Sequence, residues 1–217
     1  MARLLVLDLD GTLVDSSRDI GASVNAALER LRPGAGTIPL ERVLDFVGEG
    51  ARLLVERSLA QARLAVPVEE ALAVYLDCYR GRLLDTTRLY PGIPEALAAL
   101  GRAGPALAVL TNKPGDMSRT ILQGLGVADR FVRILGAGDV PARKPDPAGL
   151  VGLLAELEVV PAEAWMVGDS ATDVAAARGA GVRVAGVTWG FHPGALREAR
   201  PDRLFDHPRE LVALAAG

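Results

Sequence analysis

The stretch that decides the fold is Leu4-Leu5-Val6-Leu7-Asp8-Leu9-Asp10-Gly11-Thr12-Leu13-Val14-Asp15-Ser16. Its apolar run, bounded by aspartate and glycine, predicts a strand buried on both faces, as parallel strands covered by helices are. Asp8 and Asp10 follow where that strand ends, and ligands bind at the carboxyl ends of strands in open parallel sheets. A buried carboxylate is costly unless it is paired, hydrogen-bonded or metal-bound. Asp8 and Asp10 are therefore candidate catalytic residues.

The turn after this strand has a structural and a functional interpretation. An isolated Asp-Gly pair is most often a simple turn. Here Gly11 lets the backbone turn close to a ligand and expose its N–H, and Thr12 adds a hydroxyl beside it. The coincidence of the buried strand, the second aspartate Asp8 and Thr12 favours chemistry over a simple turn.

The composition excludes several classes of protein. The chain has 217 residues, half of them hydrophobic, and a net charge of −3, which predicts one or two globular domains without a general attraction to nucleic acid or to anionic membranes. The single cysteine, Cys78, permits neither an internal disulfide nor a cysteine-rich zinc site. Asp8 and Asp10 interrupt the N-terminal apolar run and Arg102 interrupts that of residues 96–110, so we expect no signal peptide and no membrane span. We therefore expect a cytoplasmic protein, as a monomer or a homodimer.

Lysine is used at only two positions. Of the 24 basic residues, Lys113 and Lys144 are the lysines and all others are arginines. An ammonium is a compact point charge, whereas a guanidinium is a planar fork. The two lysines can occur by chance; otherwise, this bias indicates two sites that need the more compact cation.

The chain divides into an α/β part and a helical part. Apolar residues recur at helical spacing from Asp19 to Leu31, and further amphipathic runs follow over residues 40–46, 51–64 and 68–84. We find no convincing strand between Asp15 and Leu89. These helices could simply cover the sheet, but their uninterrupted run favours a separate domain. We expect a catalytic core of residues 1–14 and 90–217 and an inserted helical domain of residues 15–89.

The rest of the chain alternates strands with helices. Strands are predicted over residues 106–110, 132–135, 164–167, 183–187 and, more weakly, near 204–205. One helix is predicted over residues 95–102 and a second begins at about residue 115. A third follows the 144–147 segment and ends at about residue 157, and a fourth ends at about residue 179. This alternation predicts a doubly wound parallel sheet with right-handed crossovers.

Polar residues follow four of the predicted strands, and parallel strands bring their carboxyl ends to one edge. The residues are Asp8 and Asp10, Thr111 and Asn112, Lys144, and Asp169 with Asp173. Singly, each has another interpretation: Thr111-Asn112 can end a strand, Lys144 can be a solvated lysine, and Ser170 with Asp173 can cap a helix. Together they predict a site for a divalent cation and a phosphoryl group. His192 and His207 lack ligand spacing, and we expect them at the surface.

These segments resemble, in the same order, the signatures of the haloacid-dehalogenase-like phosphohydrolases. The first stretch matches Asp-x-Asp-Gly-Thr-Leu-x-Asp-Ser at every specified position, and Thr-Asn, Lys-Pro-x-Pro and Gly-Asp-Ser-x-x-Asp follow. The resemblance implies a Rossmann-like core with Asp8 as phosphate-accepting nucleophile and Asp10 as general acid/base. It implies Mg²⁺ held by the side chains of Asp8 and Asp169 and the carbonyl of Asp10. It also implies phosphate binding by Gly11, Thr111, Asn112 and Lys144, with Asp173, Ser170, Thr12 and Lys113 as supporting residues.

The helical insert resembles the cap of phosphoglycolate phosphatases. The shorter, looser matches are Phe46-Val47-Gly48-Glu49-Gly50-Ala51, Val55-Glu56-Arg57, Tyr90-Pro91-Gly92 and Thr111-Asn112-Lys113-Pro114. A cap that closes over a small acid must supply donors for its carboxylate. We expect the turn at Gly48 and Gly50 to shape recognition of the leaving group, with Arg52 as a weaker candidate donor.

The expected function is Mg²⁺-dependent hydrolysis of a small phosphate monoester, with 2-phosphoglycolate as the leading substrate. Alternatives are a phosphosugar mutase or a broad-specificity sugar or nucleotide phosphatase of the same architecture. A dehalogenase does not need the acid/base Asp10. A receiver domain would be about half this length and would lack the helical insert. A catalytically silent regulatory or binding protein would lack a motif residue, and none is missing.

Overall fold

A six-stranded parallel sheet forms the centre of the structure, a computed structural model that describes residues 2–216. The strand order is β5-β4-β1-β6-β7-β8, and every neighbouring pair is parallel. This confirms the predicted doubly wound sheet. The strands are β1 (Leu4–Leu7), β4 (Ala106–Pro114), β5 (Arg133–Ala137), β6 (Ala164–Gly168), β7 (Arg183–Val187) and β8 (Arg203–Phe205).

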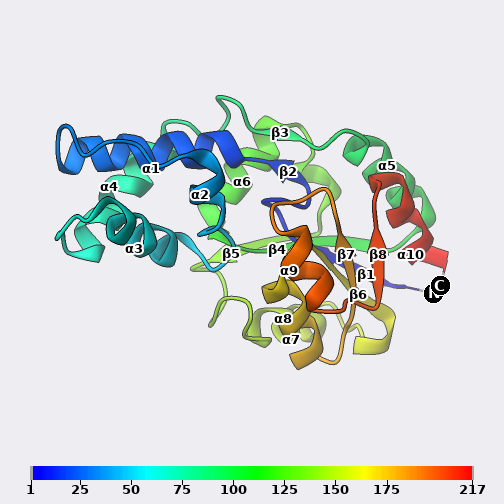
Figure 1. The fold of residues 1–217 in the computed structure, drawn as a ribbon. Helices are drawn as coiled ribbons and strands as arrows, with labels where there is room; N and C mark the ends of the chain where they lie inside the picture. The colour runs from blue at the N-terminus through cyan, green and yellow to red at the C-terminus, as the bar shows by residue number, and fades with distance from the viewer. Residues whose placement is uncertain (1, 217) are drawn as a thin grey trace.

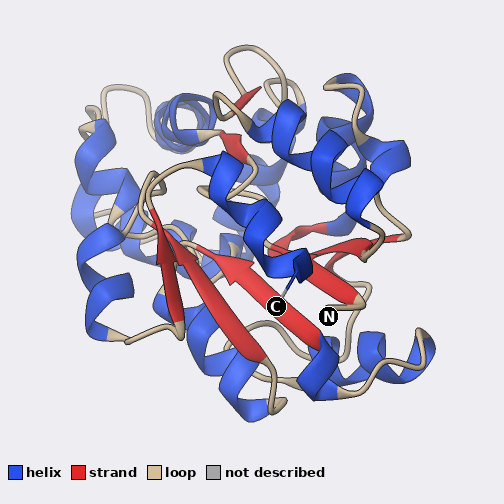
Figure 2. Cartoon of the chain, turned by 90° about the vertical axis from the view of Figure 1, so that its right-hand side faces the viewer, coloured by secondary structure: helices blue, strands red, loops and turns tan. Residues whose placement is uncertain are grey.

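Helices cover both faces of the sheet (Figures 1 and 2). Successive residues of β1 point to opposite faces, so Leu4 and Val6 join one hydrophobic cluster while Leu5 and Leu7 join the other. The first cluster includes residues of α7 (Ala148–Glu156), α8 (Ala171–Gly179) and α9 (Pro193–Glu198). The second includes residues of α5 (Ile93–Ala103), α6 (Gly115–Gly124) and α10 (Ala213–Ala216). Short 3₁₀ turns are η1 (Ala128–Arg130), η2 (Pro161–Glu163) and η3 (Pro208–Val212).

Four further helices lie together beyond the carboxyl ends of the strands, at the left of Figure 1. They are α1 (Ser17–Leu31), α2 (Leu40–Leu44), α3 (Ala51–Ala62) and α4 (Val68–Arg80). All four helices were predicted from the sequence, but the predicted α2, α3 and α4 end two to four residues later than the observed helices. Among the described residues, no helix is both long enough and apolar enough to cross a membrane.

A small antiparallel sheet joins the four helices to the core, at the point where the sequence indicated no strand. Its strands are β2 (Val14–Asp15) and β3 (Arg88–Leu89), with Val14 opposite Leu89 and Asp15 opposite Arg88. The prediction was wrong here because two residues are too few to show a period-2 pattern. The two chain crossings between the helices and the core therefore lie side by side.

Asp19, on the first turn of α1, fixes the second crossing. Its buried carboxylate accepts hydrogen bonds from the backbone N–H and the hydroxyl of both Thr86 and Thr87, at 2.5–3.0 Å. Burial alone would raise the pKa of Asp19, but these hydrogen bonds outweigh burial and hold its pKa below the ordinary value. The start of α1 and the approach to β3 are thereby joined.

We expect Asp19→Ala to lower the free energy of unfolding by about 2–4 kcal/mol, because it leaves several buried donors without an acceptor. Urea unfolding at neutral pH measures this. The control is Asp77→Ala, which removes an exposed ion pair with Arg30 and should cost less than about 1 kcal/mol. Equal losses in the two variants would contradict the account of Asp19.

The Asp19 effect should also depend on pH. A carboxyl whose pKa is lowered in the folded state stabilises the protein above its unfolded pKa, about 3.9, and this stabilisation is lost as pH falls through the folded value. We therefore expect the difference in unfolding free energy between wild type and Asp19→Ala to be constant near neutral pH and to shrink in acid. A difference that grows in acid would show that folding raises the pKa of Asp19 instead of lowering it.

Candidate active site

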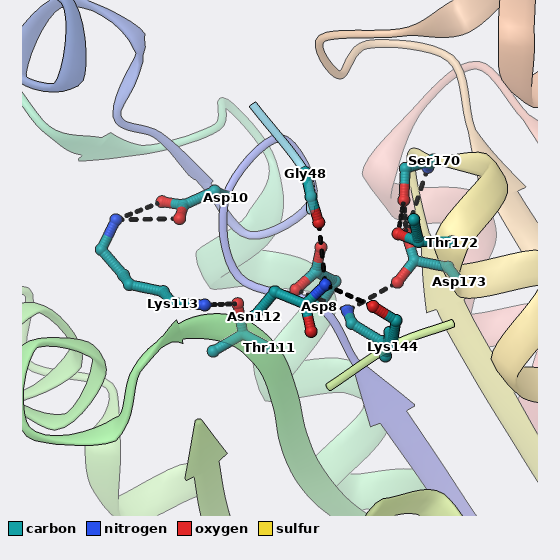
Figure 3. A network of polar contacts seen from close by, with 10 residues as sticks. All are labelled: Asp8, Asp10, Gly48, Thr111, Asn112, Lys113, Lys144, Ser170, Thr172 and Asp173. Carbon is teal, nitrogen blue, oxygen red and sulfur yellow. Dashed lines mark hydrogen bonds and ion pairs between the residues drawn. The ribbon is translucent and has the colours of Figure 1, made fainter. Parts of the chain in front are cut away.

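The residues predicted to converge do lie together at the carboxyl edge of the sheet, and Figure 3 shows all of them except Asp169. Asp8 follows β1, which lies between β4 and β6, and its N–H donates to Val167 O of β6 at 2.9 Å. Thr111 lies on β4 and Asp169 follows β6. Lys144, in the loop before α7, reaches the same edge. The sheet topology thus brings residues that are far apart in sequence to one place.

A buried ammonium connects two carboxylates of this edge. Lys144 Nζ lies 2.9 Å from Asp8 Oδ1 and 2.6 Å from Asp173 Oδ1, and only 2% of the Lys144 side chain is exposed. Burial alone would lower the pKa of Lys144, but the charges of Asp173 and Asp8 outweigh it and raise that pKa. Lys144 therefore stays charged and is a fixed partner of Asp8, not a solvated loop lysine.

Asp173 has both of the roles that the sequence left open, capping a helix and supporting Lys144. Ser170 N and Ser170 Oγ donate to Asp173 Oδ2 at 3.1 and 2.6 Å, in a capping box at the start of α8. The Ser170 hydroxyl also lies 2.8 Å from Thr172 Oγ1. Since Asp173 Oδ1 binds Lys144, one carboxylate caps the helix and positions the lysine.

Three buried carboxylates could hold a metal ion. Oxygen atoms of Asp8, Asp169 and Asp173 lie within 4.8 Å of one another. Burial raises the pKa of Asp8 to about 6, with Lys144 opposing the shift and Asp173 adding to it. Burial and the charges of Asp173 and Asp8 raise the pKa of Asp169 well above its usual range. One ammonium does not offset three carboxylates, so the donor set fits a hard divalent cation.

Gly11 must be glycine for two reasons. Its φ is +80°, in the left-handed region, and a Cβ there would lie 2.2 Å from Asp169 Oδ2. The neighbouring Thr12 is fully buried, and its carbonyl accepts a hydrogen bond from Trp189 Nε1 at 3.1 Å. The first turn thus packs directly against the carboxylate that follows β6.

The Thr111-Asn112 pair does more than end a strand. Thr111 Oγ1 accepts a hydrogen bond from Lys113 N at 3.3 Å. Asn112 Nδ2 donates to Lys144 O at 2.7 Å and to Gly48 O at 2.9 Å. Asn112 therefore links the Lys144 loop to the turn before α3.

The second lysine pairs with the second aspartate. Lys113 Nζ lies 2.8 Å from both carboxylate oxygens of Asp10, and Ser16 Oγ donates to Asp10 Oδ1. The two lysines are thus divided between the two aspartates of the first motif, Lys144 on Asp8 and Lys113 on Asp10.

A cavity that is partly open to solvent lies between this edge and helices α1, α3 and α4. Its wall includes the predicted Gly48 and Gly50, at φ +117° and +97°. Arg52 is not part of that wall, because its guanidinium pairs with Glu69 at 2.8 Å and with Glu56 at 3.6 Å. The structure therefore does not place Arg52, the weaker candidate donor, at the cavity wall.

His192 is a site residue that sequence reasoning missed. It lines the cavity, and its Nε2 lies 3.1 Å from Val47 O. The preceding residue, Phe191, donates its N–H to Asp169 Oδ2 at 2.7 Å. The available signal was position, since this loop follows β7 at the same edge of the sheet. His207 does not line the cavity.

The comparisons with known proteins agree with this geometry. The family model described as haloacid dehalogenase-like hydrolase matches residues 5–187. The chain belongs to this family. It is 37% identical to a phosphoglycolate phosphatase of Psychrobacter arcticus, over 97% of this chain and 94% of that protein. It is 38% identical to phosphoglycolate phosphatase 1 of Pseudomonas aeruginosa, over 99% of this chain and 80% of that protein.

The fold has close structural relatives as well. The crystal structure of a predicted phosphoglycolate phosphatase from Haemophilus somnus superposes with a TM-score of 0.91 at 31% identity, covering 98% of this chain and 97% of that one. Together with the family match, these relatives identify the chain as a phosphoric monoester hydrolase.

We expect Lys144→Arg to lower kcat roughly a hundredfold, although it keeps the charge. A planar guanidinium does not fit a buried position between Asp8 and Asp173 that holds a compact ammonium. Phosphate release at saturating substrate measures this. Arg130→Lys, an exposed exchange elsewhere, serves as the matched control. A near-normal kcat in Lys144→Arg would reduce the lysine to a generic positive charge.

Proposed function

We propose that the protein is a Mg²⁺-dependent phosphatase that hydrolyses 2-phosphoglycolate through an aspartyl-phosphate at Asp8. The observation that carries this proposal is the separation of two aspartates at one cavity. Asp8 is buried against Lys144, whereas Asp10 is held by Lys113 and Ser16 on the other side. One carboxylate is placed to act as nucleophile, and the other to move protons.

The residues present fit a Mg²⁺ ion. Both oxygens of Asp173 are engaged, by Lys144 and by Ser170, so Asp8 and Asp169 remain as side-chain ligands, with the Asp10 carbonyl as a third. Mg²⁺ takes few carboxylates and keeps several waters or substrate oxygens. When bound, it offsets the charge of the carboxylates and of the phosphoryl oxygens.

The chemistry follows from how the side chains are held. A carboxylate oxygen of Asp8 attacks phosphorus, and the bond from phosphorus to the leaving oxygen breaks. Asp10 takes up a proton from solvent in the substrate complex and gives it to that oxygen. Asp10 then takes a proton from a water that attacks the phosphoryl group, and this step releases phosphate and restores Asp8. Lys144, Thr111 and the backbone N–H groups after Asp8 stabilise the equatorial oxygens.

We also propose that residues 15–89 form a cap on a core of residues 1–14 and 90–217. Two short crossings join the parts at β2 and β3. Asn112 and His192 of the core contact the backbone carbonyls of Gly48 and Val47. A cap in this position excludes water and admits only small leaving groups. We also propose that the enzyme is cytoplasmic and is a monomer or a homodimer.

The substrate assignment is supported by the names of the relatives, which are phosphoglycolate phosphatases. The test is phosphate release from a panel of monoesters, with Mg²⁺ and with chelator. We expect 2-phosphoglycolate to give the highest kcat/KM, and chelation to remove activity. Preference for a hexose phosphate, with phosphoryl return to the sugar, would instead support the mutase alternative.

We expect Asp8→Asn to abolish turnover while the fold is retained, because an amide of nearly the same shape is not a nucleophile. Residual activity should fall by about 10³-fold or more. Phosphate release and a circular dichroism melt measure the two parts. Wild-type-like rates would exclude the covalent mechanism.

Asp10→Asn should lose most activity but keep Mg²⁺ binding, because the ion is proposed to use the Asp10 carbonyl and not its side chain. We expect kcat to fall by roughly 10²-fold or more with a Mg²⁺ affinity, measured by calorimetry, within a few fold of wild type. A large loss of metal affinity would show that the Asp10 side chain is itself a ligand.

A further inference from the structure

The ammonium of Lys113 occupies an unusual place between the core and the four helices. Lys113 lies near the end of β4, and only 3% of its side chain is exposed. Its Nζ contacts both oxygens of Asp10 at 2.8 Å and lies 4.5 Å from the ring centroid of Tyr79, a residue of α4. Figure 3 shows Lys113 reaching toward Asp10 and away from Lys144.

Lys113 is also the only lysine or arginine among the described residues that line the cavity. Lys144 does not line the cavity, and its ammonium is paired with the carboxylates of Asp8 and Asp173. Much of the remaining wall on the helical side is apolar or aromatic: Ile20, Val47, Ala51, Leu54, Tyr75 and Leu76. The cation on this wall is therefore placed beside the proposed acid of the leaving group.

An anionic leaving group needs such a cation. A carboxylate that enters this cavity loses water and faces the negative charges of Asp8, Asp10 and Asp169. An ammonium has three donors, and those of Lys113 are directed at Asp10 without a second carboxylate partner. The hydroxyl of Tyr79 is buried and has no hydrogen-bond partner among residues 2–216. Lys113 and Tyr79 both line the cavity, next to Asp10.

We propose that Lys113 Nζ and the Tyr79 hydroxyl form the subsite that binds the carboxylate of the leaving group. Asp10 is the counterion of Lys113 when no substrate is present, and the substrate carboxylate shares the ammonium when it binds. This inference rests on the proposed phosphatase function and assigns its selectivity for small carboxylated phosphate esters to a core lysine and a tyrosine of α4.

The test compares two substrates of the same length, 2-phosphoglycolate and 2-hydroxyethyl phosphate, which differ in having a carboxylate or a hydroxymethyl group. In Lys113→Met, we expect kcat/KM for 2-phosphoglycolate to fall roughly a hundredfold further than for 2-hydroxyethyl phosphate. Both substrates lose the part that depends on Asp10, so the ratio isolates the carboxylate. Inhibition of 2-hydroxyethyl phosphate hydrolysis by glycolate should weaken in parallel.

Two further variants sharpen the result. Tyr79→Phe removes one hydroxyl from a buried ring and should lower the substrate ratio several fold, which tests the subsite even where Lys113→Met does not fold. Arg143→Met removes an exposed cation whose guanidinium lies beside Gly50 at the cavity edge. The substrate ratio should not change in Arg143→Met.

The opposite results are distinct from one another. Equal losses on both substrates in Lys113→Met, or an unchanged ratio in Tyr79→Phe, would overturn the subsite and leave Lys113 as a partner of Asp10 alone. A ratio that collapses only in Arg143→Met would place the carboxylate at the other edge. A wild-type enzyme that hydrolyses neither ester would overturn the proposed function, and the subsite with it.

Discussion

The concentration of negative charge at one edge of the sheet constrains the rest of the site. Asp8, Asp169 and Asp173 lie within one ion's reach of each other, and the buried Lys144 is a single compensating charge. Such an arrangement opposes folding, because buried carboxylates lose hydration. The raised pKa of Asp169 expresses that cost. The same deficit of positive charge fits the divalent cation and the phosphoryl group that we propose for this site.

The two lysines separate the proposed roles of the two aspartates. Lys144 keeps Asp8 charged and fixed within a rigid set of partners that includes a helix cap. Lys113 holds Asp10 at the cavity wall, beside an aromatic ring from α4. A chain that is otherwise arginine-based has ammonium groups at these two positions, where several oxygen atoms surround one small cation. The sequence bias toward arginine therefore has a structural reason at both exceptions.

Much of this arrangement could be predicted from local sequence. The buried runs at β1, β6 and β7 are long enough to give their strands to within about one residue, and parallel topology then places Asp8, Thr111, Lys144 and Asp169 together. The missing parts depend on contacts between distant segments. β2 and β3 have only two residues each, too few to show a strand pattern. In the sequence Asp19 is an ordinary helical residue, because Thr86 and Thr87, which donate to it, are more than sixty residues away.

The same reason explains the errors about side chains around the cavity. His192 and Tyr79 carry no motif, and only the fold places them at the wall. Arg52 looked available in sequence because its partner Glu69 lies on another helix, α4. The sequence does not show whether a guanidinium is paired at the surface or free to donate; only the three-dimensional structure does. Motifs thus reveal the phosphoryl-binding half of a site more readily than the half that recognises the leaving group.

The contacts between the helices and the core explain how the leaving-group half can vary without loss of the chemistry. Asn112 and His192 bind the backbone carbonyls of Gly48 and Val47, not their side chains. Side-chain changes in that turn therefore leave the contacts intact, provided that Gly48 and Gly50 keep their positive φ values. The side chains that line the cavity include those of α1, α3, α4, β4 and the loop after β7, and the proposed carboxylate subsite uses those of α4 and β4. The phosphoryl end is positioned by the sheet, so exchanges at wall residues that do not contact Asp8 or Asp10 are expected to alter the preferred ester more than the reaction itself.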